Sequence, residues 1–249
     1  MDCSAAVKKL FKLGEYRSDA VPDYAGLGIT SADIPQLIKL ATDEELLKIN
    51  SSNPKSWVPV HAWIALGQLN AKEAIKPLIN LFHRSDRNDL IDEEMPAVFV
   101  LFGPTALPLL KKYLADDSYG VSPRITAASC IKEIGCHHEN EKEHCVQILT
   151  EQLEQYQENA PELNGFLVWY LIDLKARASI EVIQEAYRRD CVDQSIVGDL
   201  GTVEYELDLK NEPTKIQLFV NESFDKQSND EHTSTFWRNR HGSGDLDAL

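Results

Sequence analysis

The chain has 249 residues, of which 43% are hydrophobic and 26% are charged, so it is long enough to bury the core of a globular protein. Its 40 Asp and Glu residues against 25 Lys and Arg residues give a formal net charge of −15. Such a charge repels nucleic-acid phosphates and anionic membrane surfaces, so we expect neither as a partner.

Two further features concern the compartment. The longest uncharged run, residues 95–110, is interrupted by prolines and glycine and is too short to cross a bilayer, which predicts no membrane segment. Five cysteines are an odd number for a disulfide framework and are typical of free thiols in a reducing cytoplasm. We therefore expect a cytoplasmic protein.

The first predicted element is an amphipathic helix over residues 1–13. An N-terminal helical unit follows over residues 34–47, where Ile34, Leu37, Ile38 and Ala41 form an apolar stripe. Pairs of apolar helical segments follow at a repeating distance. Gly67, Gly103 and Gly135 each end the first segment of a pair, and they lie 36 and 32 residues apart, as in helical-hairpin repeats. The pairs cover residues 57–69 with 71–82, 95–102 with 106–114, 125–134 with 145–156, and 165–174 with 176–186.

The pattern changes near residue 200. Val203, Tyr205 and Leu207 alternate with acidic residues, and a second alternation follows at residues 216–220, which is compatible with a short β-hairpin. A short helix through Leu200, Val203 and Leu207 is the equal alternative. We expect a repeat domain over residues 1–200, a closing segment packed on the last repeat over 201–220, and a mostly disordered tail over 221–249.

Residues 27–47 and 57–78 resemble a bacterial family of small HEAT-repeat proteins, which is distantly similar to the HEAT-like repeats of phycobilisome lyases. The resemblance covers roughly residues 10–209 and implies an all-α fold, an α-α superhelix of about four to five HEAT-like helix pairs. Members of this family often continue into a cysteine-rich zinc motif. No cysteine follows Cys191 in this chain, so the metal does not carry over.

The sequence lacks the common signatures of catalysis, including GxSxG, GxxxxGK[ST] and GxGxxG, and we predict neither catalytic residues nor a cofactor. Residues 136–145 hold two cysteines and three histidines. Their spacing matches neither a CxxC knuckle nor HExxH, which favours a solvated loop beside a buried thiol and predicts no metal site.

Four residues are candidates for contact with a partner. Trp57 and His61 are one helical turn apart, and Asp92 and Glu93 begin an acidic run on the next repeat. An aromatic anchor beside carboxylates suits a protein or peptide ligand. Packing between repeats is the simpler explanation for Trp57 and His61, and a solvated helix face is the simpler one for Asp92 and Glu93.

The leading hypothesis is thus a non-catalytic protein-binding scaffold or adaptor. The alternative, which the lyase-like resemblance implies, is a bilin lyase-like or chromophore-chaperone role. DNA repair, which some HEAT arrays perform, is disfavoured by the net charge of −15.

Overall fold

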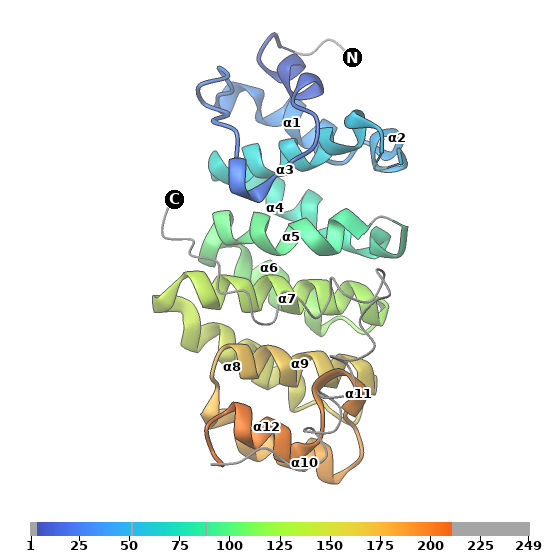
Figure 1. Cartoon of the computed structure of the whole chain (residues 1–249), viewed down its shortest axis with the longest axis vertical. Helices are drawn as coiled ribbons and strands as arrows, with labels where there is room; N and C mark the ends of the chain where they lie inside the picture. Colours follow the sequence, from blue (N-terminus) through green and yellow to red (C-terminus); the bar gives the residue numbers. More distant parts are fainter. Residues whose placement is uncertain (1–3, 51, 88, 211–249) are drawn as a thin grey trace, which may run out of the picture. The chain divides into compact units, whose positions relative to one another are not determined.

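A computed structural model describes residues 4–50, 52–87 and 89–210, and every regular element within these ranges is an α-helix or a 3-10 helix (Figure 1). The prediction of an all-α protein is therefore confirmed. The chain divides into two compact units, Met1–Val197 and Gly198–Leu249.

Unit 1 begins with an irregular stretch and continues as helix pairs. Its α-helices are α1 Ile34–Ala41, α2 Glu44–Leu47, α3 Val58–Gln68, α4 Lys72–Ile79, α5 Asp89–Phe102, α6 Leu107–Ala115, α7 Val121–His137, α8 Lys142–Leu153, α9 Pro161–Asp173, α10 Ile180–Arg188 and α11 Gln194–Val197. Its 3-10 helices are η1 Val7–Lys12, η2 Ser18–Ala20, η3 Ser31–Asp33, η4 Pro54–Trp57, η5 Phe82–Arg87, η6 Gly103–Ala106, η7 Glu139–Glu141 and η8 Arg177–Ser179.

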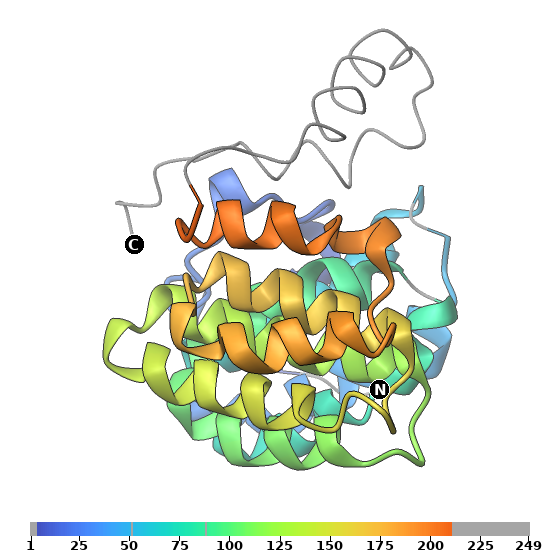
Figure 2. The same cartoon turned by 90° about the horizontal axis from the view of Figure 1, so that it is seen from below.

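The helices of unit 1 pack in two rows. In the first row α1, α3, α5, α7, α9 and α11 each contact the next, and in the second row α4, α6, α8 and α10 do the same (Figure 1). The rows contact each other through pairs such as α6 with α7 and α8 with α9. Figure 2 looks along the stack, so that successive helices of a row lie behind one another. Each predicted helix pair thus supplies one helix to each row.

The glycines that mark the repeat in the sequence are positions of close approach between elements. A Cβ atom on Gly67 of α3 would lie 2.7 Å from Leu101 Cδ1 of α5. A Cβ atom on Gly135 of α7 would lie 2.9 Å both from Cys145 Cβ and from Leu174 Cδ2. Only a residue without a side chain permits this spacing, so the repeat of glycines reflects the packing distance.

A buried polar network joins α7, α8 and α9 to the loop before α9 and the loop after α10. Asn159 Oδ1 accepts hydrogen bonds from Arg124 Nη2 at 3.1 Å and from Gln152 Nε2 at 2.8 Å. Asn159 Nδ2 donates to Asn164 Oδ1 at 2.9 Å, and Asn164 Nδ2 donates to the Cys191 carbonyl at 2.7 Å. Because these buried groups satisfy one another, the network fixes the loops around α9 at little desolvation cost.

One stretch of the described residues, Asp89–Ala115, is long and apolar enough for a membrane span by length and composition alone. It is not one straight helix, because α5 ends at Phe102, Gly103 has a φ of +55°, and α6 begins at Leu107. Half of its most apolar stretch of 18 residues is buried, because α5 packs between α3 and α7. A core helix passes the same test, so this stretch is weak evidence for a membrane span.

Unit 2 contributes α12, Leu200–Glu206, to the described residues. Asp199 Oδ1 caps this helix by accepting from the Thr202 amide at 2.8 Å. The alternative of a β-hairpin is therefore wrong for residues 203–209, where Val203 and Leu207 follow a helical period from Leu200 and are buried, whereas Tyr205 and Leu209 are exposed. The proposed second strand and the tail over 221–249 lie outside the described residues, and the predicted boundaries at 200 and 220 stay predictions.

Candidate interaction surface

His61 is 1% exposed and lies inside unit 1, where it joins α3 to the N-terminal segment, defined here as residues 4–33. His61 Nε2 is 3.0 Å from the Gly14 carbonyl and Nδ1 is 2.8 Å from Tyr24 Oη. Since a carbonyl only accepts, Nε2 carries the proton, and Nδ1 accepts from the Tyr24 hydroxyl. Burial lowers the pKa of His61, although the Gly14 hydrogen bond partly opposes it. Both ring nitrogens thus serve an internal contact.

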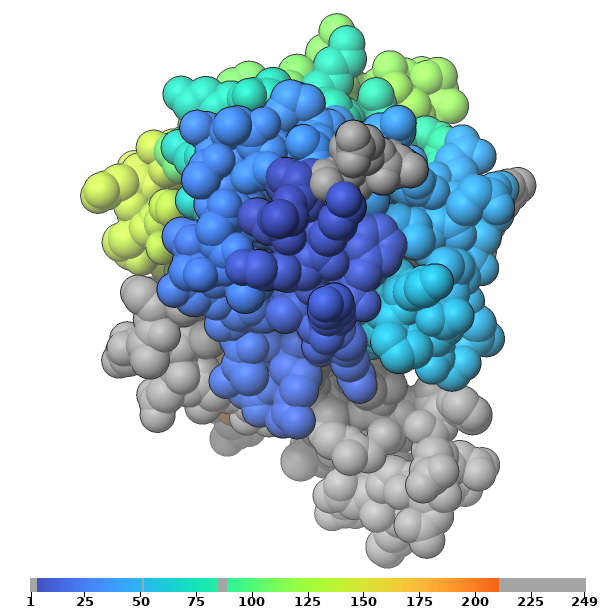
Figure 3. Space-filling view, turned by 90° about the horizontal axis from the view of Figure 1, so that it is seen from above, coloured from blue at the N-terminus to red at the C-terminus, as the bar shows by residue number. Residues whose placement is uncertain are grey.

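The N-terminal segment covers α3 with apolar side chains. Val7, Leu10, Tyr16, Tyr24 and Ile29 are all buried, and η1 contacts α3 directly. Together with α1 and α5, which pack on α3 from the same row, this segment buries every residue from Val58 to Gly67. Figure 3 shows this end of unit 1, where the blue surface belongs to the N-terminal segment and the helices that follow it.

Trp57 lies at the last position of η4, directly before α3, and is half-buried. Asp92 and Glu93 lie in the first half of α5 and are exposed. The Asp92 carboxylate accepts a hydrogen bond from Thr126 Oγ1 of α7. The four predicted residues thus lie on neighbouring parts of the first row, but His61 is directed to the N-terminal segment and Asp92 to α7. Their contact with a partner stays a prediction.

The carboxylates of α5 lie close to one another. Burial raises the pKa of Glu93, and the negative charges of Asp89 and Asp92 raise it further. Burial and the charge of Glu93 raise the pKa of Glu94 to about 7. Glu94 also raises the pKa of Tyr16, after the larger effect of burial, which places Glu94 beside the N-terminal segment. This part of α5 therefore carries concentrated negative charge.

A second group of acidic residues lies where α7 meets α9. Lys132 of α7 pairs with Glu133, and Lys132 Nζ is 3.7 Å from Asp173 Oδ2 of α9. The same Nζ atom is 5.8 Å from the ring centroid of Tyr170. Burial favours a neutral Lys132, but the two carboxylates overcome this effect and raise its pKa. Lys132 thus pairs with carboxylates of both α7 and α9, and Glu133 also lies 3.5 Å from His137 Nδ1.

Aromatic rings adjoin these carboxylates on α9. Phe166 and Trp169 are half-buried, and their rings stack with centroids 5.8 Å apart and an interplanar angle of 24°. Tyr170 is buried; burial raises its pKa, and Asp92 and Asp173 add smaller increases, so both carboxylates lie near its ring.

Of these acidic and aromatic residues, the sequence arguments identified only Asp92 and Glu93. Phe166 and Trp169 lie three positions apart on α9, and this helical spacing was a usable signal for a shared side of the helix. Nothing in the sequence places Asp173 beside Lys132, because that contact joins residues 41 positions apart from two different repeats.

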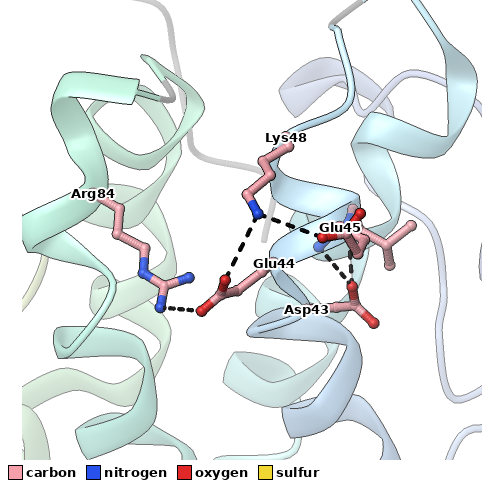
Figure 4. Close-up of polar contacts among 6 residues, drawn as sticks. Asp43, Glu44, Glu45, Lys48 and Arg84 are labelled. Carbon is pink, nitrogen blue, oxygen red and sulfur yellow. Dashed lines mark hydrogen bonds and ion pairs between the residues drawn. The ribbon is translucent and has the colours of Figure 1, made fainter.

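Other acidic residues of unit 1 are paired with cations. Arg84 Nη2 is 2.8 Å from Glu44 Oε1, and Lys48 Nζ lies 3.8 Å from Glu44 and 3.4 Å from Glu45 (Figure 4). Asp43 uses its carboxylate to cap α2 in the same view. Arg84 lowers the pKa of Glu44, whereas the pKa of Glu93 is raised. The two clusters therefore differ in electrostatics: cations lower the pKa of Glu44, whereas the carboxylates of Asp89 and Asp92 add to the raised pKa of Glu93.

The cysteine and histidine cluster does not converge on a common point. Cys136 is exposed, whereas Cys145 is buried against Gly135. His138 Nε2 is 2.8 Å from the Val100 carbonyl of α5 and so joins α7 to α5. Among the residues that the structure describes, no three His, Cys, Asp or Glu side chains are arranged to hold a metal ion.

Comparison of the chain with protein-family profiles, with curated proteins and with solved structures gives no match in any of the three. The HEAT-repeat resemblance therefore stays a prediction.

Proposed function

We propose that this chain is a HEAT-type helical scaffold that binds a protein or peptide partner through the surface of its first row. The observation that supports this most directly is the succession of α3, α5, α7 and α9, each packed on the next. A helix pair cannot bury its apolar face alone, and stacked pairs produce an extended surface whose side chains come from several repeats. Such surfaces suit extended ligands better than small reactants.

The use of the buried polar groups supports a binding role over catalysis. His61 holds the N-terminal segment through both ring nitrogens, and Arg124 is bound to Asn159 within the buried network. These groups already have partners that join elements of the fold, so their role is structural. Polar groups of an active site are instead directed at a reactant.

We place the protein in the cytoplasm and expect no nucleic acid as its ligand. Cys130, Cys136, Cys145 and Cys191 are free thiols, which suit a reducing compartment. The net charge of −15 opposes contact with phosphate backbones.

Site-specific photo-crosslinking tests the proposal. A photoreactive residue replaces Glu93, exposed on α5 of the first row, or Lys112, exposed on α6 of the second row. We expect reproducible crosslinks to a protein from the source cell at position 93 and few at position 112. Equal crosslinking at both positions, or none at position 93, would contradict binding through the first row.

A further inference from the structure

We infer that residues 14–29 form a pH-sensitive latch on α3, which stays closed while the His61 imidazole is neutral and opens more often when the imidazole is protonated. These residues are part of the N-terminal segment and are called the latch below. The inference goes beyond the proposed function, because it concerns a movement within unit 1 and requires no partner.

The latch is attached to α3 mainly at one side chain. Its one regular element is the short helix η2, and its buried side chains are Tyr16, Tyr24 and Ile29. His61 contacts two of these three, since both tyrosine rings meet the imidazole edge-on and the Tyr24 hydroxyl is 2.8 Å from Nδ1. The Gly14 carbonyl, at the start of the latch, is 3.0 Å from Nε2. The attachment of the latch therefore depends on the protonation state of His61.

This geometry suits a neutral imidazole. Nε2 donates to the Gly14 carbonyl, and Nδ1 accepts from the Tyr24 hydroxyl. A second proton, on Nδ1, would place two donors opposite each other unless the hydroxyl turned its own proton away. The Tyr24 side chain is 2% exposed, and its hydroxyl has no other hydrogen-bond partner in the part of the chain that the structure describes. Protonation of His61 thus leaves a buried donor without an acceptor.

The charged groups around α3 do not offset a buried imidazolium. Those of the latch are exposed, and so are those of η1, α1, α2 and η4, which pack on α3: Glu15, Arg17, Asp19 and Asp23 of the latch, then Lys8, Lys9, Lys12, Lys39, Glu44, Glu45 and Lys55. On α5, Asp89, Asp92 and Glu93 are exposed and Glu94 is half-buried. None of these charges contributes to the shift of the His61 pKa, which burial lowers and the Gly14 hydrogen bond partly raises. Glu94, whose pKa is about 7, is mostly neutral at lower pH.

An open latch lets the imidazolium reach water, so protonation favours opening. The pKa of His61 is lower in the closed state than its ordinary value of 6.5, and the closed state therefore loses stability relative to the open one as the pH falls below 6.5. Between about pH 7.5 and about pH 5.5 the equilibrium constant for opening should rise about threefold to tenfold.

Amide hydrogen exchange of the full chain, read by mass spectrometry, measures this opening. Five amides donate within the latch and are protected while it is closed, namely those of Ala20, Gly26, Leu27, Gly28 and Ile29. Protection factors are corrected for the chemical exchange rate at each pH. His61→Gln is the variant that does not titrate, because its amide can both donate to Gly14 and accept from Tyr24. His137→Gln, at an exposed histidine of α7, is the matched control.

We expect the latch protection of wild type and of His137→Gln to fall about threefold to tenfold from about pH 7.5 to about pH 5.5, while α9 keeps its protection. The latch protection of His61→Gln should be the same at both pH values. A wild-type latch that is protected equally at both, an equal fall in His61→Gln, or a parallel fall in α9 would overturn the inference.

A His61→Gln latch that is unprotected at both pH values leaves the decision to wild type. The latch protection must then fall with the same midpoint as the titration of the His61 imidazole, followed by NMR through the signal that is absent from His61→Gln. Different midpoints for the two titrations would overturn the inference.

Discussion

Tyr24 and His61 are joined by a buried hydrogen bond of 2.8 Å that spans 37 residues of sequence. His61 also binds the Gly14 carbonyl, and the rings of Tyr16 and Tyr24 both meet the imidazole edge-on with centroids 6.0 Å away. One histidine of α3 therefore fixes two positions of an N-terminal segment that has little regular structure of its own.

Replacing Tyr24 with phenylalanine should destabilise the protein by about 2 kcal/mol, because His61 Nδ1 would remain buried without a donor. Urea unfolding measures the change. The control is Tyr205→Phe, at a residue that is 38% exposed, which should change the free energy of unfolding by less than about 0.5 kcal/mol. Equal stabilities of Tyr24→Phe and wild type would show that the hydrogen bond does not hold the segment.

Glu94→Gln should make stability less dependent on pH. The pKa of Glu94 is raised from 4.5 to about 7 in the folded protein, so the folded state binds more protons than the unfolded state between these values. The contribution of Glu94 is fully present below pH 4.5 and is lost as the pH rises through about 7.

Above pH 7 the Gln variant should therefore be more stable than wild type, by about 1 kcal/mol once solvent screening of a half-buried carboxylate is allowed for. Denaturant unfolding across this pH range gives the difference curve. A difference that stays constant from acid to neutral pH would mean that Glu94 does not titrate with a raised pKa. The pH dependence of stability that His61 contributes has the opposite sign. Its pKa is lowered in the folded protein, so its contribution to stability is lost as the pH falls below 6.5, in wild type and in the Glu94→Gln variant alike.

Gly67→Ala should lower the melting temperature by about 4–8 °C, which corresponds to about 2 kcal/mol for a chain of this size. The new Cβ would meet Leu101 Cβ at 2.8 Å as well as Leu101 Cδ1, so α3 and α5 must move apart. Gly120→Ala is the control, because its Cβ would have no neighbour closer than 3.7 Å. A variant at position 67 that melts with wild type would refute the packing role of the repeat glycines.

Chelators should leave the melting temperature unchanged. Cys145 is buried in the α7–α8 packing and His138 binds the Val100 carbonyl, so the cluster of residues 136–145 contributes to the fold through packing and hydrogen bonds. A structural zinc site would couple metal binding to folding by many kcal/mol. Stoichiometric zinc release with a large fall in melting temperature would contradict this account.

The helices were predictable from the sequence because their signals are local. The periodic apolar residues and the glycines at 67, 103 and 135 indicated the helix pairs. In the structure each pair contributes one helix to each of the two rows. At Val203, Tyr205 and Leu207 the sequence left helix and strand open, because the same residues alternate as in a strand while Val203 and Leu207 also fit one face of a helix, with Tyr205 exposed. Seven residues of α12 are too few to distinguish the two periods by pattern alone.

The candidate surface was less predictable because it depends on contacts between repeats. For His61, a candidate for contact with a partner, packing between repeats was the simpler explanation, but the sequence could not name Tyr24 or Gly14 as its hydrogen-bond partners. Likewise, Asp92 was recognisable as part of an acidic run, whereas its hydrogen bond to Thr126 joins two helices 34 residues apart in the chain. Long-range contacts of this kind follow from the stacking of α5, α7 and α9.

The most direct test of the central claim is quantitative affinity capture from the source cell, with the full chain as bait and mass spectrometry as the readout. Three baits are compared: wild type, the first-row variant Glu93→Gln with Glu133→Gln, and the second-row control Glu143→Gln with Glu154→Gln. We predict a protein that wild type and the control retain equally and the first-row variant loses. Retention of the same proteins by all three baits, or of none by wild type, would contradict binding through the first row.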